Sequence, residues 1–248
     1  MIPKKIHYCW FGGNPLPESA QECIASWRKY LPGYEIIEWN ESNFDVNAIR
    51  YTAQAYQARK YAFVSDYARF KILYDHGGLY FDTDVEIIAP LDGILRQGAF
   101  MGIEKSKATA KKNPSGWVGI NPGLGIGAEK GNVLYGAILA KYAAMEFDLN
   151  GGTVVRHTTD VLTAFGFDGK NNIQTVGNVT IYPDDYFCPM DSTTGLLSVT
   201  SNTVSIHHYT CSWMDQKSIS FRLHLLKNRL IRIFGARVVT SIARFLKP

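Results

Sequence analysis

The 248-residue chain has little cysteine, and none of it is arranged as a metal or redox motif. Its four cysteines, Cys9, Cys23, Cys188 and Cys211, lie far apart and form no C-x-x-C pair. Zinc and dithiol chemistry are therefore not indicated. Scattered thiols of this kind favour a reducing compartment such as the cytosol.

Long apolar runs are also missing. No stretch approaches the roughly 18 to 20 apolar residues that a membrane span needs. The N-terminus MIPKKIHYCWFGG lacks the apolar core and cleavage site of a signal peptide, so we expect a cytoplasmic protein. With 46% hydrophobic and 19% charged residues, the composition is that of a packed globular protein and excludes a disordered chain.

Acidic residues are absent from the end of the chain. Residues 216–248 carry eight lysines and arginines and no acid, whereas the other 215 residues carry 18 basic and 22 acidic groups. Leu223, Leu226 and Leu230 recur there at helical spacing. A basic amphipathic helix is typical of a protein that lies on an anionic membrane, and packing of this helix against the domain is the alternative. We therefore divide the chain into a main domain, 1–215, and a basic extension, 216–248, and expect no nucleic-acid partner.

The chain begins with alternating strand and helix patterns. Residues 5–10 and 34–39 are short β-prone runs, and 17–30 between them place apolar residues at helical spacing. This order predicts a βαβ unit and hence an α/β fold with a largely parallel sheet. A long helix is expected over 53–75, and a long surface loop rich in Gly, Lys, Asn and Pro over 105–131.

The central motif is Asp82-Thr83-Asp84, which follows the apolar run Leu-Tyr-Phe. In an extended chain residues i and i+2 project to the same side, so both carboxylates can face one cation. Mg²⁺ and Mn²⁺ take such oxygen ligands and usually share them with substrate phosphates. An isolated Asp-x-Asp also occurs by chance, and a solvated turn is the alternative.

Two further pairs strengthen the motif. Asp66 and Arg69 share a helix face and suit sugar hydroxyls and phosphates, with a surface ion pair as the alternative. His207 and His208 close a predicted strand. Either could supply a nitrogen ligand, which Mn²⁺ tolerates better than Mg²⁺. Trp10, at the end of the first strand, can offer its flat face to a nucleotide base, or it can pack in the core.

The segments IPKKIHYCWFGG, SDYARFKILYDHGGLYFDTDVEIIAPLD and HHYTCSW together resemble glycosyltransferase family 32. This family is similar to the catalytic domains of large clostridial toxins. The resemblance covers most of the first 95 residues and the segment near residue 210. It implies a GT-A fold, with a Rossmann-like mixed sheet flanked by helices, and a divalent metal. It also implies transfer of a sugar from a nucleotide diphosphate with net retention of anomeric configuration.

The resemblance also implies roles for single residues. Trp10 would stack on the base, and Asp66 and Arg69 would bind ribose and donor sugar. Tyr8 and Trp213 are weaker candidates for the same donor site. The donor is expected to be a UDP-sugar, with a GDP-sugar as the alternative.

For the metal, Asp84 would ligate Mn²⁺ or Mg²⁺ directly, with Asp82 close by. His208 matches the late ligand position of such transferases, and His207 is the second choice. No catalytic base is identified from the sequence. Asn121 in GINPGLG is one candidate on the acceptor or sugar side, and Asp160 in RHTTDVLT is another.

Two other functions fit parts of the sequence. A haloacid-dehalogenase-type phosphatase would use Asp82 as nucleophile and Asp84 as acid/base, with Asp184 and Asp185 as its late acidic motif, but Glu86 stands where Thr or Val is required. A non-catalytic membrane- or carbohydrate-binding module would leave the paired acids unexplained. The sequence therefore predicts a metal-dependent glycosyltransferase. We expect a glycan or lipid-linked acceptor, a role in surface polysaccharide synthesis, and a position on the inner face of a bacterial membrane.

Overall fold

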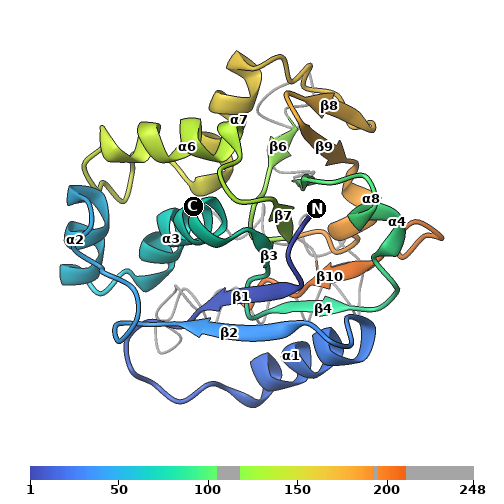
Figure 1. Cartoon of the computed structure of the whole chain (residues 1–248), viewed down its shortest axis with the longest axis horizontal. Helices are drawn as coiled ribbons and strands as arrows, with labels where there is room; N and C mark the ends of the chain where they lie inside the picture. The colour runs from blue at the N-terminus through green and yellow to red at the C-terminus, as the bar shows by residue number, and fades with distance from the viewer. Residues whose placement is uncertain (105–117, 193–194, 211–248) are drawn as a thin grey trace, which may run out of the picture.

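The computed structural model describes residues 1–104, 118–192 and 195–210. Within these ranges the chain forms a mixed β-sheet flanked by helices (Figure 1), which confirms the predicted α/β class. Trp213 and the predicted extension 216–248 lie outside the described residues. None of the described helices is long and apolar enough to cross a membrane.

The helices are α1 (Glu18–Tyr30), α2 (Arg50–Gln57), α3 (Tyr61–His76), α4 (Asp92–Leu95), α6 (Val133–Ala143), α7 (Val154–Ala164) and α8 (Asp184–Phe187). The first strands are β1 (Lys5–Cys9), β2 (Glu35–Trp39), β3 (Gly78–Tyr80), β4 (Val85–Ile87) and β5 (Phe100–Glu104). The later strands are β6 (Gly119–Ile120), β7 (Ile126–Ala128), β8 (Gln174–Val176), β9 (Val179–Tyr182) and β10 (Ser205–His207).

The main sheet has the strand order β2-β1-β3-β7-β5-β9-β8, with β6 paired to β5 beside it. Strands β2, β1 and β3 are mutually parallel, as the βαβ pattern predicts, and β5 is parallel to β9. Because β7 and β8 run antiparallel to their neighbours, the sheet is mixed rather than largely parallel. Strands β4 and β10 form a separate antiparallel pair.

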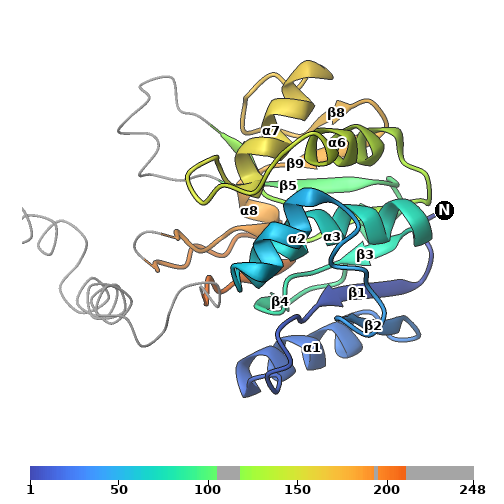
Figure 2. The ribbon, with the colours of Figure 1, turned by 90° about the vertical axis from the view of Figure 1, so that its left-hand side faces the viewer.

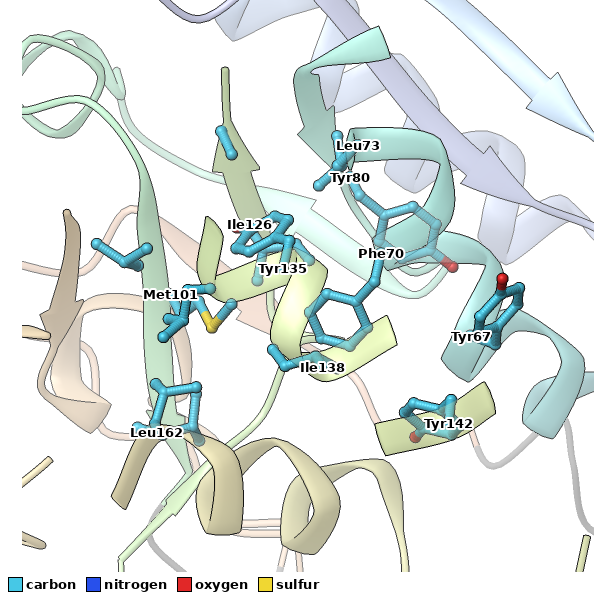
Figure 3. Close-up of a cluster of buried hydrophobic side chains, with 14 of the residues drawn as sticks. Tyr67, Phe70, Leu73, Tyr80, Met101, Ile126, Tyr135, Ile138, Tyr142 and Leu162 are labelled. Atoms are coloured by element: carbon cyan, nitrogen blue, oxygen red, sulfur yellow. The ribbon is translucent and has the colours of Figure 1, made fainter. Parts of the chain in front are cut away.

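Apolar side chains fill both faces of the sheet. Along β3 successive side chains alternate, as a strand requires: Leu79 packs in one core cluster and Tyr80 in the other. The cluster around Phe70, Tyr135 and Met101 lies under α2, α3, α6 and α7 (Figure 3). The opposite cluster is covered by α1 and the β4–β10 pair, so the molecule has helices on both sides of the sheet (Figure 2).

Two predicted segments differ from the structure. The helix expected over 53–75 is two helices, α2 and α3, with a break at Arg59, whose φ is 56°. In the segment expected to be a surface loop, the described residues 118–131 include β6 and β7, both buried. The prediction failed there because these strands have only two and three residues. Such short strands do not show the alternation of apolar and polar residues by which a strand is predicted.

The directions of the strands bring the ends of several strands to one edge of the sheet. Strands β1, β3 and β5 all end at this edge, because β7 is antiparallel to both β3 and β5. For the same reason the turn that precedes β7 lies beside the end of β3. Strand β10 ends beside the start of β4, where His207 pairs with Val85. The acidic motif between β3 and β4 therefore lies where five segments meet.

Candidate active site

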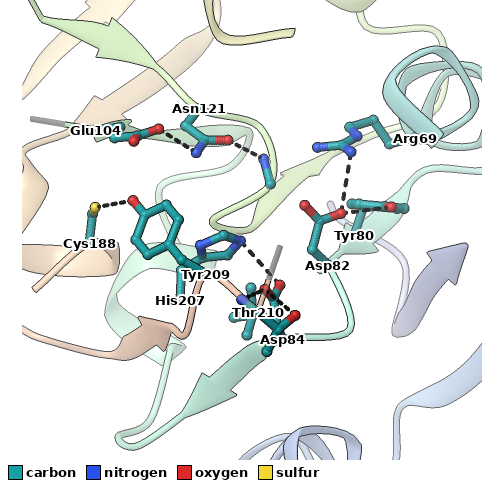
Figure 4. A network of polar contacts seen from close by, with 12 residues as sticks. Arg69, Tyr80, Asp82, Asp84, Glu104, Asn121, Cys188, His207, Tyr209 and Thr210 are labelled. Carbon is teal, nitrogen blue, oxygen red and sulfur yellow. Dashed lines mark hydrogen bonds and ion pairs between the residues drawn. The ribbon is translucent and has the colours of Figure 1, made fainter. Parts of the chain in front are cut away.

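The two aspartates of the motif occupy the short connection between β3 and β4. Asp82 and Asp84 have side chains that are 27% and 15% exposed, so both are largely enclosed but remain open to a ligand. One ligand atom each from Asp82, Asp84 and His207 lie within 4.8 Å of one another. Figure 4 shows that these side chains converge from the β3–β4 connection and from the end of β10.

Asp84 is held by the chain that follows β10. His207 Nε2 lies 3.2 Å from Asp84 Oδ1. Thr210 donates its N–H and its hydroxyl to Asp84 Oδ2, at 2.9 and 3.0 Å. Burial opposes ionisation, but His207 and the Thr210 hydrogen bonds outweigh it and hold the pKa of Asp84 below its usual range. Burial likewise disfavours a charged His207, yet the pKa of His207 is raised because Asp84 stabilises the imidazolium.

Asp82 faces a buried arginine. Arg69 Nη2 lies 3.3 Å from Asp82 Oδ1 and 3.1 Å from Asp66 Oδ1, and the Arg69 side chain is only 4% exposed. The hydroxyl of Tyr80 donates to Asp82 Oδ1 at 3.0 Å. The guanidinium carbon of Arg69 lies 5.1 Å from the Tyr80 ring centroid, a cation–π distance. The pair on α3 is thus buried and joined to the motif, which excludes the simple surface ion pair.

Burial is the largest influence on the pKa values of Asp66 and Asp82, the two carboxyl groups beside Arg69. It raises the pKa of Asp66 to about 7, against the attraction of Arg69. It also raises the pKa of Asp82, with Arg69 again opposing. The Arg69 guanidinium thus partly compensates the charge of two buried carboxylates, those of Asp66 and Asp82. Such a group suits polar ligands that bring further hydrogen bonds or charge compensation.

The turn before β7 forms the wall on the other side of Asp82. Asn121 donates from Nδ2 to Glu104 Oε2 at 2.6 Å, and its Oδ1 accepts the N–H of Gly123 at 2.8 Å. A Cβ atom at Gly123 would lie 2.3 Å from Asp82 Oδ2. Asn121, which the sequence offered as a candidate on the acceptor or sugar side, therefore lies beside the Asp82–Arg69 pair, and two hydrogen bonds fix its side chain.

The donor set fits a divalent cation. Two carboxylates and one imidazole are ligands that Mn²⁺ accepts, and Mg²⁺ accepts the oxygens. The Nδ1 atom of His207 is buried and has no hydrogen-bond partner among the described residues. Asp84, Asp82 and His207 are therefore the residues that would hold the metal.

The structure places His207, and not His208, together with the two aspartates. His208, the first choice as metal ligand, turns away from the aspartates, and its Nε2 lies 2.9 Å from Glu86 Oε2. His207, the second choice, faces Asp84. His207 is the last residue of β10 and His208 follows the strand directly, and in extended chain adjacent side chains point to opposite sides.

An open pocket of about 460 Å³ borders Asp84 next to the N-terminal half of α1. That volume lies within the range of small-molecule sites. The described residues that line it are mostly polar: Ser19, Glu22, Cys23, Asp84, Glu86, His208 and Thr210.

Trp10 and Tyr8, both predicted at the nucleotide, have different positions. Trp10 is half-buried at the end of β1, and its indole N–H donates to the carbonyl of Asn14 at 2.7 Å. Tyr8 is buried in the core, and its hydroxyl donates to Glu38 Oε2 at 2.7 Å. Its ring meets Trp27 of α1 edge-on. Trp10 therefore remains a candidate for stacking, whereas the side chain of Tyr8 is used in packing against α1.

Asp160, the second acid–base candidate, is not part of the group around Asp82. It lies on the exposed side of α7, and its carboxylate pairs with Lys141 of α6 at 2.9 Å. That pairing places the Asp160 carboxylate at the surface between two helices. Trp213 lies outside the described residues.

The structure adds residues that the sequence did not point to. Tyr80, Glu104 and Thr210 contact the motif or Asn121, and Tyr209 packs edge-on against His207 with ring centroids 4.3 Å apart. Tyr209 has a φ of 50°, a backbone conformation that non-glycine residues rarely adopt and that is common near functional sites. Its only sequence signal is its place beside the histidine pair.

The phosphatase alternative does not fit this arrangement. Its late acidic motif, Asp184 and Asp185, begins α8 and is used in surface contacts. Asp184 accepts from Asn171 at 2.6 Å, and Asp185 accepts from Asn202 at 2.9 Å. A phosphatase would require these carboxylates beside Asp82, where the structure places Arg69.

Residues 17–101, which include the acidic motif, match the family described as "Glycosyltransferase sugar-binding region containing DXD motif". Subversion of eukaryotic traffic protein A of Legionella pneumophila is 28% identical over 117 residues, which are 36% of this chain and 18% of the relative. Inositol phosphoceramide mannosyltransferase 1 of Schizosaccharomyces pombe is 29% identical over 111 residues, which are 40% of this chain and 33% of the relative. The matched part thus spans no more than about a third of these relatives.

Among solved structures, PaToxG Glycosyltransferase aligns with a TM-score of 0.49 at 18% identity, covering 66% of this chain and 69% of that chain. The family match agrees with the resemblance predicted from the three sequence motifs. Over residues 17–101, the chain is thus similar to the glycosyltransferases whose sugar-binding region contains the DXD motif.

Proposed function

We propose that the chain is a metal-dependent, retaining glycosyltransferase that moves a sugar from a nucleotide diphosphate to a glycan or lipid-linked acceptor. The observation that carries the proposal is that Asp82, Asp84 and His207 each place one ligand atom within 4.8 Å of the other two. Beside it, Arg69 and Asp66 form a buried pair, and Arg69 also contacts Asp82. A cation site joined to a sugar-binding pair is what transfer from a sugar diphosphate requires.

Each part of the site has a task in this proposal. Asp84, Asp82 and His207 would hold Mn²⁺ or Mg²⁺, which would supply positive charge to a departing diphosphate. Asp66 and Arg69 bind hydroxyls of the donor. Trp10 stacks on the base. The wall at Gly123 and Asn121 keeps the carboxylate of Asp82 in place while the donor is bound.

The identity of the donor is tested by a screen of UDP-sugars and GDP-sugars with Mn²⁺, read out as nucleotide release and as thermal shift. A UDP-sugar is our first expectation, and the name of the fission-yeast relative, a mannosyltransferase, adds GDP- and UDP-mannose to the screen. Release of nucleotide from one donor should require Mn²⁺ or Mg²⁺ and should disappear in Asp84→Asn. Equal release in EDTA would contradict the proposal.

For the acceptor, we propose a lipid-linked glycan at the inner face of a bacterial membrane, in surface polysaccharide synthesis. The support is the basic amphipathic pattern of residues 216–248, which carries eight cations at roughly 1 kcal/mol each near an anionic leaflet. The name of the fission-yeast relative also includes a lipid, inositol phosphoceramide. Liposome flotation of the full chain and of a chain that ends at Gln216 tests this. Equal flotation of the two proteins on anionic vesicles would contradict it.

A further inference from the structure

The turn that follows β1 depends on glycine. Gly12 has a φ of 96°, and a Cβ atom there would lie 2.4 Å from Cε2 of Tyr61, the first residue of α3. The next residue, Gly13, also has a positive φ, of 66°. Glycine adopts such angles without strain but leaves the chain many other conformations. The turn therefore needs a contact from outside to keep one geometry.

Glu41 supplies that contact. Its Oε1 atom accepts the backbone N–H of Gly12 at 2.7 Å and the hydroxyl of Tyr56 at 3.0 Å. Tyr56 belongs to α2, and its ring lies 5.4 Å from the ring of Tyr61. A single carboxylate oxygen thus joins the turn after β1 to α2, and the two tyrosines continue the contact to α3.

The position of Glu41 is itself fixed. It lies in a turn after β2 in which the side chain of Asn40 accepts from the Ser42 N–H at 2.9 Å, and that of Asn43 accepts from the Asn40 N–H at 2.8 Å. Partial burial opposes ionisation, but hydrogen bonds from Gly12 and Tyr56 lower the pKa of Glu41. The bond to Gly12 is therefore charge-assisted and stronger than a neutral one.

The same turn carries Trp10. The backbone N–H of Trp10 donates to the Trp39 carbonyl at 2.8 Å, and its indole N–H donates to the Asn14 carbonyl at 2.7 Å. Gly12 is the middle residue of the five-residue turn that this Trp10–Asn14 hydrogen bond closes. The orientation of the indole thus depends on the conformation that Glu41 imposes at Gly12.

We propose, on the basis of the proposed function, that Glu41 is a positioning residue for the nucleotide: it holds the Gly12 turn so that Trp10 is presented to the base. Glu41 acts through this turn and not on the reacting atoms. Its loss therefore weakens donor binding and leaves the transfer step of bound donor unchanged. Among the side chains that the structure describes, Glu41 alone accepts the N–H of Gly12.

The test compares Glu41→Ala, Glu41→Gln and a control, Glu35→Ala, which removes an exposed carboxylate of β2 that pairs only loosely with Lys5 at 3.9 Å. Titration calorimetry with UDP and with GDP, each with Mn²⁺, measures binding without turnover, and donor hydrolysis gives KM and kcat. Loss of one hydrogen bond to a charged group predicts Kd and KM raised about tenfold in Glu41→Ala, with kcat nearly unchanged. Glu41→Gln keeps an acceptor oxygen for Gly12 and should recover most of the binding, and Glu35→Ala should match the wild type.

The outcomes separate this inference from the function on which it rests. If the wild type binds a nucleotide and Glu41→Ala binds it equally well, the positioning role is overturned and the proposed function stands. A fall in kcat as large as the rise in KM, or Glu41→Gln no better than Glu41→Ala, also overturns it. If the wild type binds neither nucleotide, the proposed function falls as well. Should Glu41→Ala fail to fold, Glu41→Asp, with the acceptor withdrawn by one methylene, is expected to show the same loss of binding.

Discussion

Gly123 approaches Asp82 so closely that a Cβ atom at residue 123 would lie 2.3 Å from the Oδ2 atom of that aspartate. The same Cβ atom would lie 3.3 Å from Nη1 of Arg69. The backbone of the turn before β7 is therefore a wall against which the Asp82 carboxylate rests. Glycine is required here for space, because any side chain would occupy the position of a carboxylate oxygen.

Gly123→Ala should therefore lower activity while the protein remains folded. The methyl group forces Asp82 or the turn to move, and a displacement of about 1 Å at a reacting group costs roughly 10²-fold in rate. Activity should be compared with that of Gly93→Ala in α4, where an added Cβ meets no atom within 4 Å. Wild-type activity in Gly123→Ala would show that the geometry of Asp82 is not needed.

Asp84→Asn should abolish metal-dependent turnover. The amide keeps the shape of the side chain but removes the negative charge that would hold Mn²⁺, so activity should fall by several orders of magnitude. Glu86→Gln is the matched control, because Glu86 lies two residues away and pairs with His208 instead of facing the metal ligands. Isothermal titration with Mn²⁺ should show a lost site in Asp84→Asn and an intact one in Glu86→Gln.

His207→Ala should weaken Mn²⁺ binding far more than His208→Ala. We expect a loss of about 10- to 100-fold for His207→Ala, the range seen when a metal site loses a supporting group. His208→Ala removes only a partly exposed contact to Glu86 and should stay within about twofold, since exposed ion pairs contribute little. A larger loss of Mn²⁺ binding in His208→Ala than in His207→Ala would show that His208 is the metal ligand.

Trp10→Ala should reduce nucleotide affinity by about 1 to 3 kcal/mol, which is the usual contribution of one stacking contact. The transfer rate at saturating donor should change little, because the indole lies at the end of β1 and not among the metal ligands. Calorimetric titration with the nucleotide identified in the donor screen checks this. An unchanged affinity would mean that Trp10 serves only to close its turn through Asn14.

The parts of the site that the sequence predicted are those set by local chain geometry. Asp82 and Asp84 are two residues apart at a strand exit, and Asp66 and Arg69 are one helical turn apart. Spacing alone decides that each pair shares a face. The order of strand and helix patterns likewise predicted the parallel β1–β2 pair.

The parts that it missed depend on pairing between distant segments. Whether His207 or His208 meets Asp84 follows from the register of β10 against β4, and nothing local separates adjacent histidines. The break between α2 and α3 falls at Arg59, which adopts a left-handed φ of 56° without the Gly, Asn or Pro that usually marks a helix end. Tyr8 has the residue type of a ligand-binding side chain, but only the packing of α1 shows that it is in the core.

Asp66 should give the protein a distinctive dependence of stability on pH. Burial raises the pKa of Asp66 to about 7 in the folded protein, whereas the pKa of an aspartate in an unfolded chain is about 3.9. As pH rises from about 4 to about 7, the unfolded state has already lost this proton while the folded state still holds it. The unfolded state then binds fewer protons, so this residue makes the free energy of unfolding fall over that window.

Asp66→Asn removes the titrating group and leaves Arg69 paired with Asp82. The free energy of unfolding of the variant, measured relative to the wild type by urea denaturation in EDTA, should therefore rise with pH between about 4 and about 7 and level off above. EDTA keeps Asp82, Asp84 and His207 free of metal, so that metal binding does not mask the effect. A difference between the two proteins that is the same at every pH would mean that Asp66 is ionised throughout, with Arg69 outweighing its burial.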